Sequence, residues 1–328
     1  MSLIQRLKNE HIGYASAIIA AILFGSVSTI TKPVLEDINA FSVSSLTYII
    51  AGLSLVPFLK FSFTNSNSNN NNTLEPDNST SNKKRKWTDN NNNKKKNYFL
   101  LLLTSLCGAV IAPTLFFSGL SNTSASDSSI LINGEVLFSI LLAIVFFNEK
   151  LIRREIVALV LVLVGIVILT TNMQFLSSSS STSNYFIELN IGNILIVGST
   201  LFWALDNNIS KIISKTTHIP KIIVLKSLIG GLLLFILTVT IFGIEQFNVV
   251  DTIHIPYLVF AGSMGFGASL FFFLNSLKRI GTIKTILLFS TSPIFGMIFA
   301  KIFLNETITI YQIIAVVVIL LGCYFIKR

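Results

Sequence analysis

The feature that most constrains this chain is a series of apolar runs, each long enough to cross a lipid bilayer as a helix. A spanning helix takes about 20 apolar residues. Only 12 % of the 328 residues are charged, which is half the share of about 25 % in soluble domains. We therefore expect an all-α integral membrane protein with ten transmembrane helices, at residues 12–30, 41–59, 98–118, 129–147, 151–171, 191–209, 222–243, 257–277, 283–303 and 308–326.

Two polar segments interrupt this series. Residues 62–97 contain Asn tracts and two clusters of Lys and Arg, and since they have almost no apolar mass to bury, we expect a disordered loop. A contact of the basic clusters with anionic lipids is the alternative interpretation. Residues 172–190 form a second polar linker. The chain therefore divides into a first unit at 12–171 and a second unit at 191–328.

The distribution of positive charge predicts the orientation in the membrane. With ten spans, both termini and every second loop lie on one side, and that side receives all 24 Lys and Arg residues except Lys32 and Lys301. Cytoplasmic loops collect Lys and Arg, so we expect both termini in the cytoplasm and the plasma membrane as the compartment. These loops explain the net charge of +9, and we do not expect a nucleic-acid partner.

The histidines and cysteines argue against a metal site, a cofactor and an enzyme. His11, His218 and His254 fall at the edges of the apolar runs, and Cys107 and Cys323 lie inside them without the spacing of metal ligands. An intramembrane enzyme would need a cluster of such groups inside the spans. We expect no metal, no cofactor and no catalytic residue.

The two units match each other along the sequence. Over their C-terminal parts the offset is a constant 157 residues, and the positions in register include Asn148-Glu149 with Asn305-Glu306, Gly108 with Gly265, and Gly165 with Gly322. At the start of each unit the offset is 179, which pairs Phe24-Gly25 with Trp203-Ala204 and Lys32 with Lys211. Each unit thus has five helices, and because five is odd the units are inverted relative to each other. Inverted repeats are common in secondary transporters, whose substrate site lies between the halves.

These features resemble the EamA type of the drug/metabolite transporter superfamily over nearly the whole chain. The resemblance rests on the aromatic-small pairs at Phe24 and Trp203, and on a fourth helix that ends in Glu149 or Glu306, sixteen residues before a glycine. It implies a ten-helix fold and the export of a small molecule such as an amino acid, another metabolite or an organic cation. The Glu-Pro motif of the family is split here between Glu135-Val136 in the first unit and Ser292-Pro293 in the second.

Two acids inside the predicted spans are the main candidates for binding a substrate or a proton. Glu135 lies about 9 Å below the outer end of its span, where a carboxyl group is suited to exchanging a proton, and the alternative is a structural contact with Asn133. Asp206 lies about 22 Å below the outer end of its span, close to the cytoplasmic boundary, with Asn207 as a polar neighbour and Lys211 nearby. We expect no direct pair between the two acids.

Three further candidates enter through the repeat. Trp203 and Phe24 occupy matching positions and are expected to line a central cavity. Ser292 is the second-unit counterpart of Glu135 at the offset of 157.

Other features are expected to be structural. Glu149 and Glu306 should fix the turn into the fifth helix of each unit, through backbone N–H groups at its N-terminus. Lys301 is expected to extend its ammonium group to the outer surface. Small residues at helical spacing favour tight helix packing and are equally compatible with a homodimer.

The sequence thus predicts a secondary transporter that moves a small molecule by alternating access, with a proton or another cation as the coupling ion. A phosphate-binding Gly-rich motif is missing from the sequence, which favours this class over ATP-driven transport. An anionic Glu135 favours a cationic or zwitterionic substrate. The alternatives are a non-transporting membrane scaffold or sensor that uses the basic loop, and an intramembrane enzyme.

Overall fold

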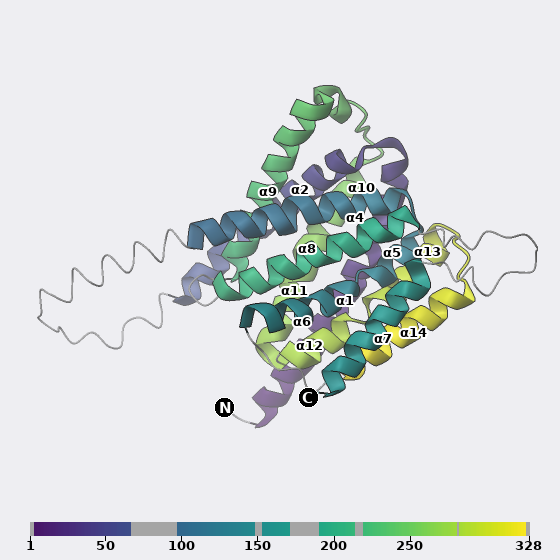
Figure 1. Cartoon of the computed structure of the whole chain (residues 1–328). Coiled ribbons are helices and arrows are strands. Elements are labelled where there is room, and N and C mark those ends of the chain that lie inside the picture. Colours follow the sequence, from purple (N-terminus) through teal and green to yellow (C-terminus); the bar gives the residue numbers. More distant parts are fainter. Residues whose placement is uncertain are drawn as a thin grey trace, which may run out of the picture.

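The computed structural model describes residues 3–66, 97–147, 153–170, 190–213, 219–280 and 282–325, and every regular element within them is helical (Figure 1). The predicted all-α class is therefore confirmed for these residues. Glu149, most of the Asn/Lys-rich segment and most of the 172–190 linker lie outside them. Where the loop was predicted to begin at residue 62, the second helix continues to Ser66.

The described elements of the first unit are α1 (Leu3–Asp37), α2 (Ala40–Ser66), η1 (Cys107–Ile111), α4 (Ala112–Ser121), α5 (Ala125–Leu131), α6 (Gly134–Phe147) and α7 (Arg153–Thr170). Those of the second unit are α8 (Ile191–Ile213), α9 (Ile219–Phe242), η3 (Ile244–Phe247), α10 (Ile255–Phe260), η4 (Ala261–Ala268), α11 (Ser269–Ile280), α12 (Thr282–Phe289), α13 (Ser292–Phe303) and α14 (Ile310–Phe325). Here η1 and η4 are π-helical turns and η3 is a 3₁₀ turn.

Five helices in the described residues are long and apolar enough to cross a membrane, namely Glu10–Asp37, Ala40–Pro57, Asn97–Ser121, Pro220–Phe242 and Ile255–Ser276. Shorter apolar helices run over Leu159–Thr170, Ser292–Phe303 and Ile310–Gly322. Large apolar side chains stay exposed along them, such as Leu163 on α7 and Val317 on α14. An exposed apolar surface of this extent fits a lipid environment.

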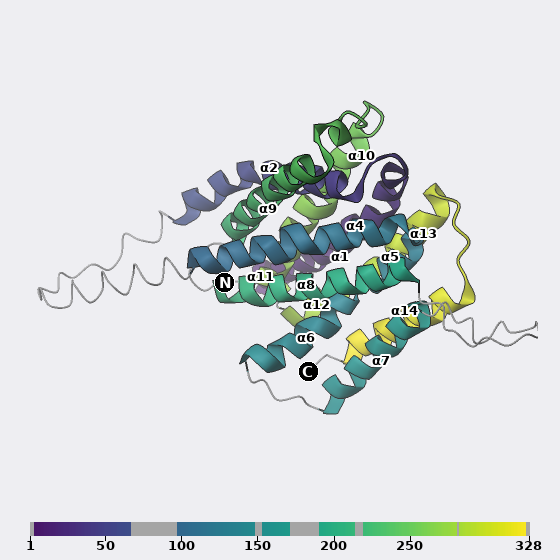
Figure 2. The same ribbon diagram turned by 45° about the horizontal axis from the view of Figure 1, so that its top comes forward.

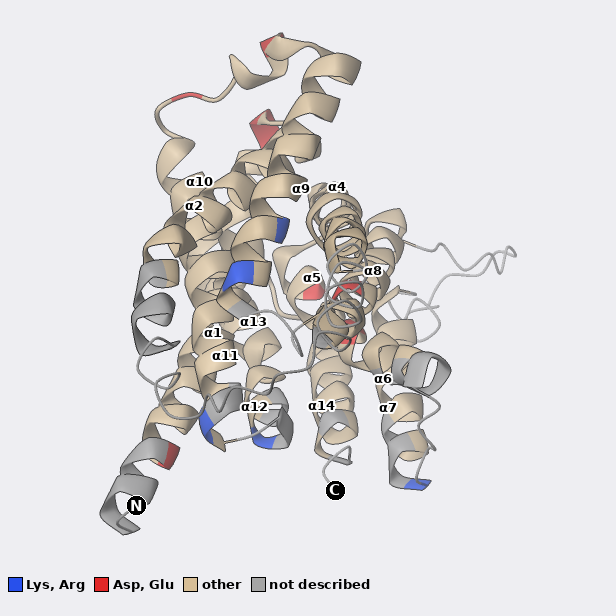
Figure 3. Cartoon of the chain, turned by 90° about the vertical axis from the view of Figure 1, so that its left-hand side faces the viewer, with Lys and Arg blue, Asp and Glu red and all other residues tan. Residues whose placement is uncertain are grey.

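The bundle has two flanks and a packed centre. The pair α2 and α9 lies on one side and the pair α7 and α14 on the other, with α1, α4 and α8 between them (Figure 2). The helix α1 begins and α14 ends at the same end of the bundle, which we call the terminal end (Figure 3). The opposite end, where α5 and α14 begin, is called the far end. The largest buried side chains, among them Phe116, Phe117 and Leu131, belong to one continuous core.

The fourth helix of each unit is broken, whereas the sequence predicted single spans at 129–147 and 283–303. The first break separates α5 from α6 at Ile132 and Asn133, and the second separates α12 from α13 at Ser290 and Thr291. Pro293 stands at the start of α13, where its missing N–H costs nothing but where it disfavours helix in the residue before it. The two breaks touch, because Asn133 Nδ2 donates a hydrogen bond to the Ser290 carbonyl oxygen at 3.3 Å.

Glycines allow α4 and α8 to cross closely. A Cβ atom on Gly192 would lie 2.7 Å from the carbonyl oxygen of Gly119, and one on Gly119 would lie 2.6 Å from that of Gly192. The crossing therefore depends on the missing side chains. Gly198 in the same helix differs, since a Cβ there would meet nothing closer than Leu115 Cδ1 at 3.7 Å.

This contrast gives a matched test of the helix crossing. We expect Gly192→Ala to lower the free energy of unfolding by about 1–3 kcal/mol, because the added methyl group overpacks the crossing. Gly198→Ala has room for its methyl group and should leave it unchanged or slightly higher. Unfolding of the purified protein in mixed micelles would measure both, and an equal loss in the two variants would contradict the crossing described here.

Candidate functional site

The first element of the site is a polar contact that joins the two units near the middle of the bundle. Glu135 lies in the first turn of α6, and its Oε1 accepts a hydrogen bond from Asn207 Nδ2 on α8. The fourth helix begins at Ala125, so Glu135 is ten residues in, or about 15 Å. This corrects the shallower depth predicted from a start at Ser129. Asn133 does not serve as the partner of Glu135, since its amide turns to the other helix break.

The second element is a buried ion pair. The Lys226 ammonium group on α9 contacts Asp206 Oδ2 on α8, and Asp206 Oδ1 accepts a hydrogen bond from Ser210 Oγ at 3.1 Å. Asp206 is 3 % exposed and Lys226 8 %. Asp206, which the sequence places close to the cytoplasmic boundary, is therefore held inside the protein by an ion pair. Its partner was missed because Lys226 was assigned to the cytoplasmic charges, whereas α9 begins at Ile219 and carries Lys226 about two turns inside.

The ion pair lies against Gly108 in the π-helical turn η1. The Asp206 side chain packs so closely on Gly108 that a Cβ atom there would overlap it. Trp203 Nε1 donates to the Gly108 carbonyl oxygen and to the Tyr48 hydroxyl, each at 3.2 Å. The Trp203 ring lies 5.3 Å from that of Phe116. Trp203, Asp206 and Asn207 lie close together on α8.

The repeat counterparts of Trp203 and Glu135, which are Phe24 and Ser292, lie at a second place. Phe24 packs on Phe289 and Phe266, with ring centroids 5.2 and 6.2 Å apart. A Cβ atom on the neighbouring Gly25 would lie 2.5 Å from the Ser292 carbonyl oxygen. Phe24 and Ser292 therefore lie near each other, because Gly25 packs on the Ser292 backbone. The Tyr48 ring, 5.2 Å from Phe266, connects this aromatic group to Trp203.

The far end is held by contacts from the second unit to α5. Glu306 accepts hydrogen bonds from Ala125 N at 2.8 Å, Ser126 N at 3.0 Å and Ser126 Oγ at 2.6 Å. Glu306 therefore binds backbone N–H groups at a helix N-terminus, as predicted, but the helix is α5 of the other unit and not α14. Nearby, Gln312 Nε2 donates to Asp127 Oδ1 at 2.7 Å.

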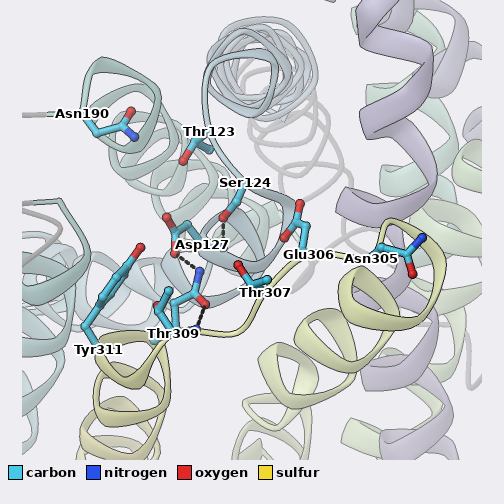
Figure 4. Close-up of a pocket in the computed structure, with 10 residues that line it drawn as sticks. Thr123, Ser124, Asp127, Asn190, Asn305, Glu306, Thr307, Thr309 and Tyr311 are labelled. Atoms are coloured by element: carbon cyan, nitrogen blue, oxygen red, sulfur yellow. Dashed lines mark hydrogen bonds between the residues drawn. The ribbon is translucent and has the colours of Figure 1, made fainter.

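A hollow of about 520 Å³ opens beside these contacts (Figure 4). Its walls carry polar groups from both units, namely Thr123, Ser124, Asp127, Asn190, Asn305, Glu306, Thr307, Thr309, Tyr311 and Gln312. Lys32 closes the adjoining end of α4, since its ammonium group donates to the carbonyl oxygens of Leu120 and Thr123 at 2.7 Å each. The far end is thus tied by side chains that satisfy the ends of α4 and α5.

Comparison with known proteins identifies the family. The model of the EamA-like transporter family matches residues 11–171 and 190–328. The chain belongs to the EamA-like transporter family. An uncharacterized transporter of Methanothermobacter thermautotrophicus is 33 % identical over 312 residues, which cover 95 % of this chain and 85 % of that relative. A solved crystal structure of a protein matches with a TM-score of 0.60 at 13 % identity, covering 98 % of this chain and 96 % of that one, and supports the fold alone.

Membership of the EamA-like family confirms the resemblance found in the sequence, and with it a membrane transporter. Within the described residues, groups of three or more His, Cys, Asp or Glu side chains that could hold a metal ion are absent. This EamA-like chain instead brings ionisable and amide side chains together near the middle of the bundle. Such groups bind polar substrates or protons when they face a cavity between membrane helices.

The ion pair generates a test of stability. We expect Asp206→Asn to lower the free energy of unfolding by about 3–5 kcal/mol, because it leaves the Lys226 charge buried without a partner. Glu245→Gln, which removes an exposed acid from η3, serves as the control and should have no effect. Unfolding in mixed micelles measures both variants, and equal stability of Asp206→Asn and the wild type would show that the pair is not buried as described.

Proposed function

We propose that this protein is a secondary transporter of small molecules that works by alternating access, with its two ends opening in turn. The observation that carries the proposal is a difference in packing between the two broken helices. α5 packs against α13 and α14 of the other unit. Its counterpart α12 packs on α1 and α11, without comparable packing on α6 or α7 in the described part of the chain.

The proposal requires two related units, and the element boundaries support this. At the offset of 157 found in the sequence, the starts of α6 and α13 after the two helix breaks correspond to within one residue. In each third helix, a π-helical turn gives way to α-helix at matching positions, Ala112 and Ser269. We therefore infer two inverted five-helix repeats, ten spans in all.

The contact between the helix breaks supports the same inference. Asn133 and Ser290 are 157 residues apart, so they are equivalent positions in the two units, and they bond to each other. Equivalent residues meet where a two-fold axis passes between them. The transport site of inverted-repeat transporters lies on such an axis near the bilayer midplane.

Because the repeats are inverted, exchanging the packing of the equivalent helices α5 and α12 gives a second state of the protein. In the present state α12 stays with α1, where Lys284 Nζ lies 5.5 Å from the centre of the Tyr14 ring. In the opposite state α12 would close on α6 and α7, while α5 would leave α13 and α14. With both termini in the cytoplasm of the cell, as the Lys and Arg distribution predicts, the end at which α12 stays apart from α6 and α7 is the cytoplasmic one.

Within this mechanism Glu135 is the residue that exchanges the proton or binds the cationic group of the substrate. Its contact with Asn207 crosses from one unit to the other, so protonation of Glu135 changes a bond that has to break when the units move. An acid at this depth favours cationic or zwitterionic substrates, and we propose export across the plasma membrane, driven by proton entry.

The role of Glu135 is tested by flux into proteoliposomes that contain a pH-sensitive dye. With a panel of amines, amino acids and sugars outside, we expect the wild type to move protons with at least one compound and Glu135→Gln to move none, since an amide cannot carry the proton. Glu245→Gln, an exposed acid, is the control. Equal proton movement by wild type and Glu135→Gln would exclude this role.

The alternation is tested at the far end. In a background with Cys107 and Cys323 replaced by Ala, Ser129→Cys places a thiol on α5 that is buried against Gly296 of α13. We expect Glu306→Gln to speed its labelling by an impermeant reagent, because the amide loses the charge that binds the α5 N-terminus, an effect of about 1–2 kcal/mol and so several-fold in rate.

The matched control for this labelling is Glu36→Gln, which removes an exposed acid at the end of α1 on the same side. It should leave the labelling rate unchanged. A Glu306→Gln variant that labels at the wild-type rate would mean that the Glu306 contacts do not hold the far end closed.

A further inference from the structure

The buried ion pair is present in one unit and missing from the other. At the offset of 179 that aligns the starts of the units, Asp206 corresponds to Val27 and Lys226 to Thr47. Both units nevertheless make the same helix contact. Asp206 packs on Gly108, and Val27 packs on Gly265, which is the counterpart of Gly108.

The first unit thus builds this crossing from neutral residues. Thr47 is buried and satisfies its own hydroxyl group on the Val43 carbonyl oxygen at 2.7 Å. Replacing a buried ion pair by apolar residues is often neutral or stabilising, because desolvation cancels the attraction between the charges. The fold therefore does not require a charge at 206 or at 226, and the pair needs a functional explanation.

The hydrogen-bond donors that Lys226 and its neighbour Tyr48 leave unused indicate which kind of ligand the site binds. A lysine ammonium group has three donors, and Asp206 is the hydrogen-bond partner of Lys226 among the described residues. The Tyr48 hydroxyl accepts the Trp203 N–H bond, and its own proton meets no acceptor in the described part of the chain. Both groups are buried around Gly108. Unused donors of a lysine and a tyrosine in a buried place call for an acceptor, and a carboxylate supplies two oxygens.

We propose that Lys226, positioned by Asp206, binds the carboxylate of a zwitterionic substrate, with the Tyr48 hydroxyl as a further donor and Glu135 taking the ammonium end. This rests on the proposed transport site and assigns its anionic subsite. The site carries two acids and one base, so a lone carboxylate would add repulsion. A zwitterion adds no net charge, and it places its ammonium group on the second acid.

The test uses the neutral pair that the chain itself contains. The double variant Asp206→Val/Lys226→Thr copies the first unit, and Lys221→Thr, an exposed lysine on the same helix, is the matched control. Binding is measured by the shift in melting temperature, with triplets that share one side chain, such as leucine, isoamylamine and 4-methylpentanoate. Tyr48→Phe removes a single hydroxyl group and serves as a milder variant, should the double variant fold poorly.

We expect the wild type and Lys221→Thr to bind a zwitterion about tenfold or more tightly than its matched amine, the strength of a hydrogen bond to a charged group. The double variant should lose this preference and keep its affinity for the amine, and Tyr48→Phe should reduce the preference severalfold. A wild type without any preference for carboxylate-bearing compounds would overturn the proposal, as would a double variant or Tyr48→Phe that retains it in full.

Transport is measured separately on the same panel, which keeps the two claims apart. A wild type that binds zwitterions in this way and moves none of them supports the subsite and contradicts the transport function. A wild type that transports amines with proton coupling and no preference for a carboxylate supports the function and overturns the subsite.

Discussion

The constraint on which the rest of this structure depends is that backbone polar groups inside a bilayer must find partners within the protein. Continuous helices meet it by themselves, but the fourth helix of each unit is broken, and α4 ends beside α5. These ends are satisfied from elsewhere in the chain. Lys32 takes the carbonyl groups at the end of α4, and Glu306 takes the N–H groups at the start of α5.

This requirement also explains why the two units hold each other at the far end. The carboxylate that satisfies α5 comes from a residue 180 positions away in the other unit. A contact needed by the backbone thus becomes a contact between units. In the proposed mechanism, α5 moves and its N-terminus exchanges Glu306 for other partners, such as water in the hollow beside it. Movement of α5 and loss of this contact between the units are then one event, which makes the far end suited to a gate.

The lipid environment also bears on the difference between the units, of which only the second carries the buried ion pair. A symmetric pair of helix bundles could alternate without any charge, as the neutral crossing of Val27 on Gly265 illustrates. Burying the charges of Asp206 and Lys226 away from water costs desolvation free energy. In the proposed transport site, these charges and Glu135 would give a polar substrate partners in place of the water that it loses.

Much of the fold could be predicted because it follows from local composition. Apolar runs of spanning length determined the all-helical class, and the constant offset between Asn148-Glu149 and Asn305-Glu306 aligned units whose π-helical turns end at matching positions. The helix breaks escaped prediction, since Asn133 and Ser290 lie within runs apolar enough to pass as one span.

The candidate site was predicted in part, for a related reason. Glu135, Asp206 and Trp203 stood out as polar or aromatic groups inside apolar runs. Lys226 did not, because a lysine a few residues into a run looks like an interfacial residue until its burial and its contact with Asp206 are known. The target of Glu306 depends on a contact between distant segments, which no local pattern contains.

The most direct test of the central claim, that the two ends open in turn, is a pair of distance measurements between spin labels in lipid. One pair, at Ser121 and Thr307, spans the far end, and the other, at Leu141 of α6 and Lys284 of α12, spans the terminal end. On changing from alkaline to acidic buffer, we expect the two distances to change in opposite directions. Distances that stay fixed, or that lengthen together, would contradict it.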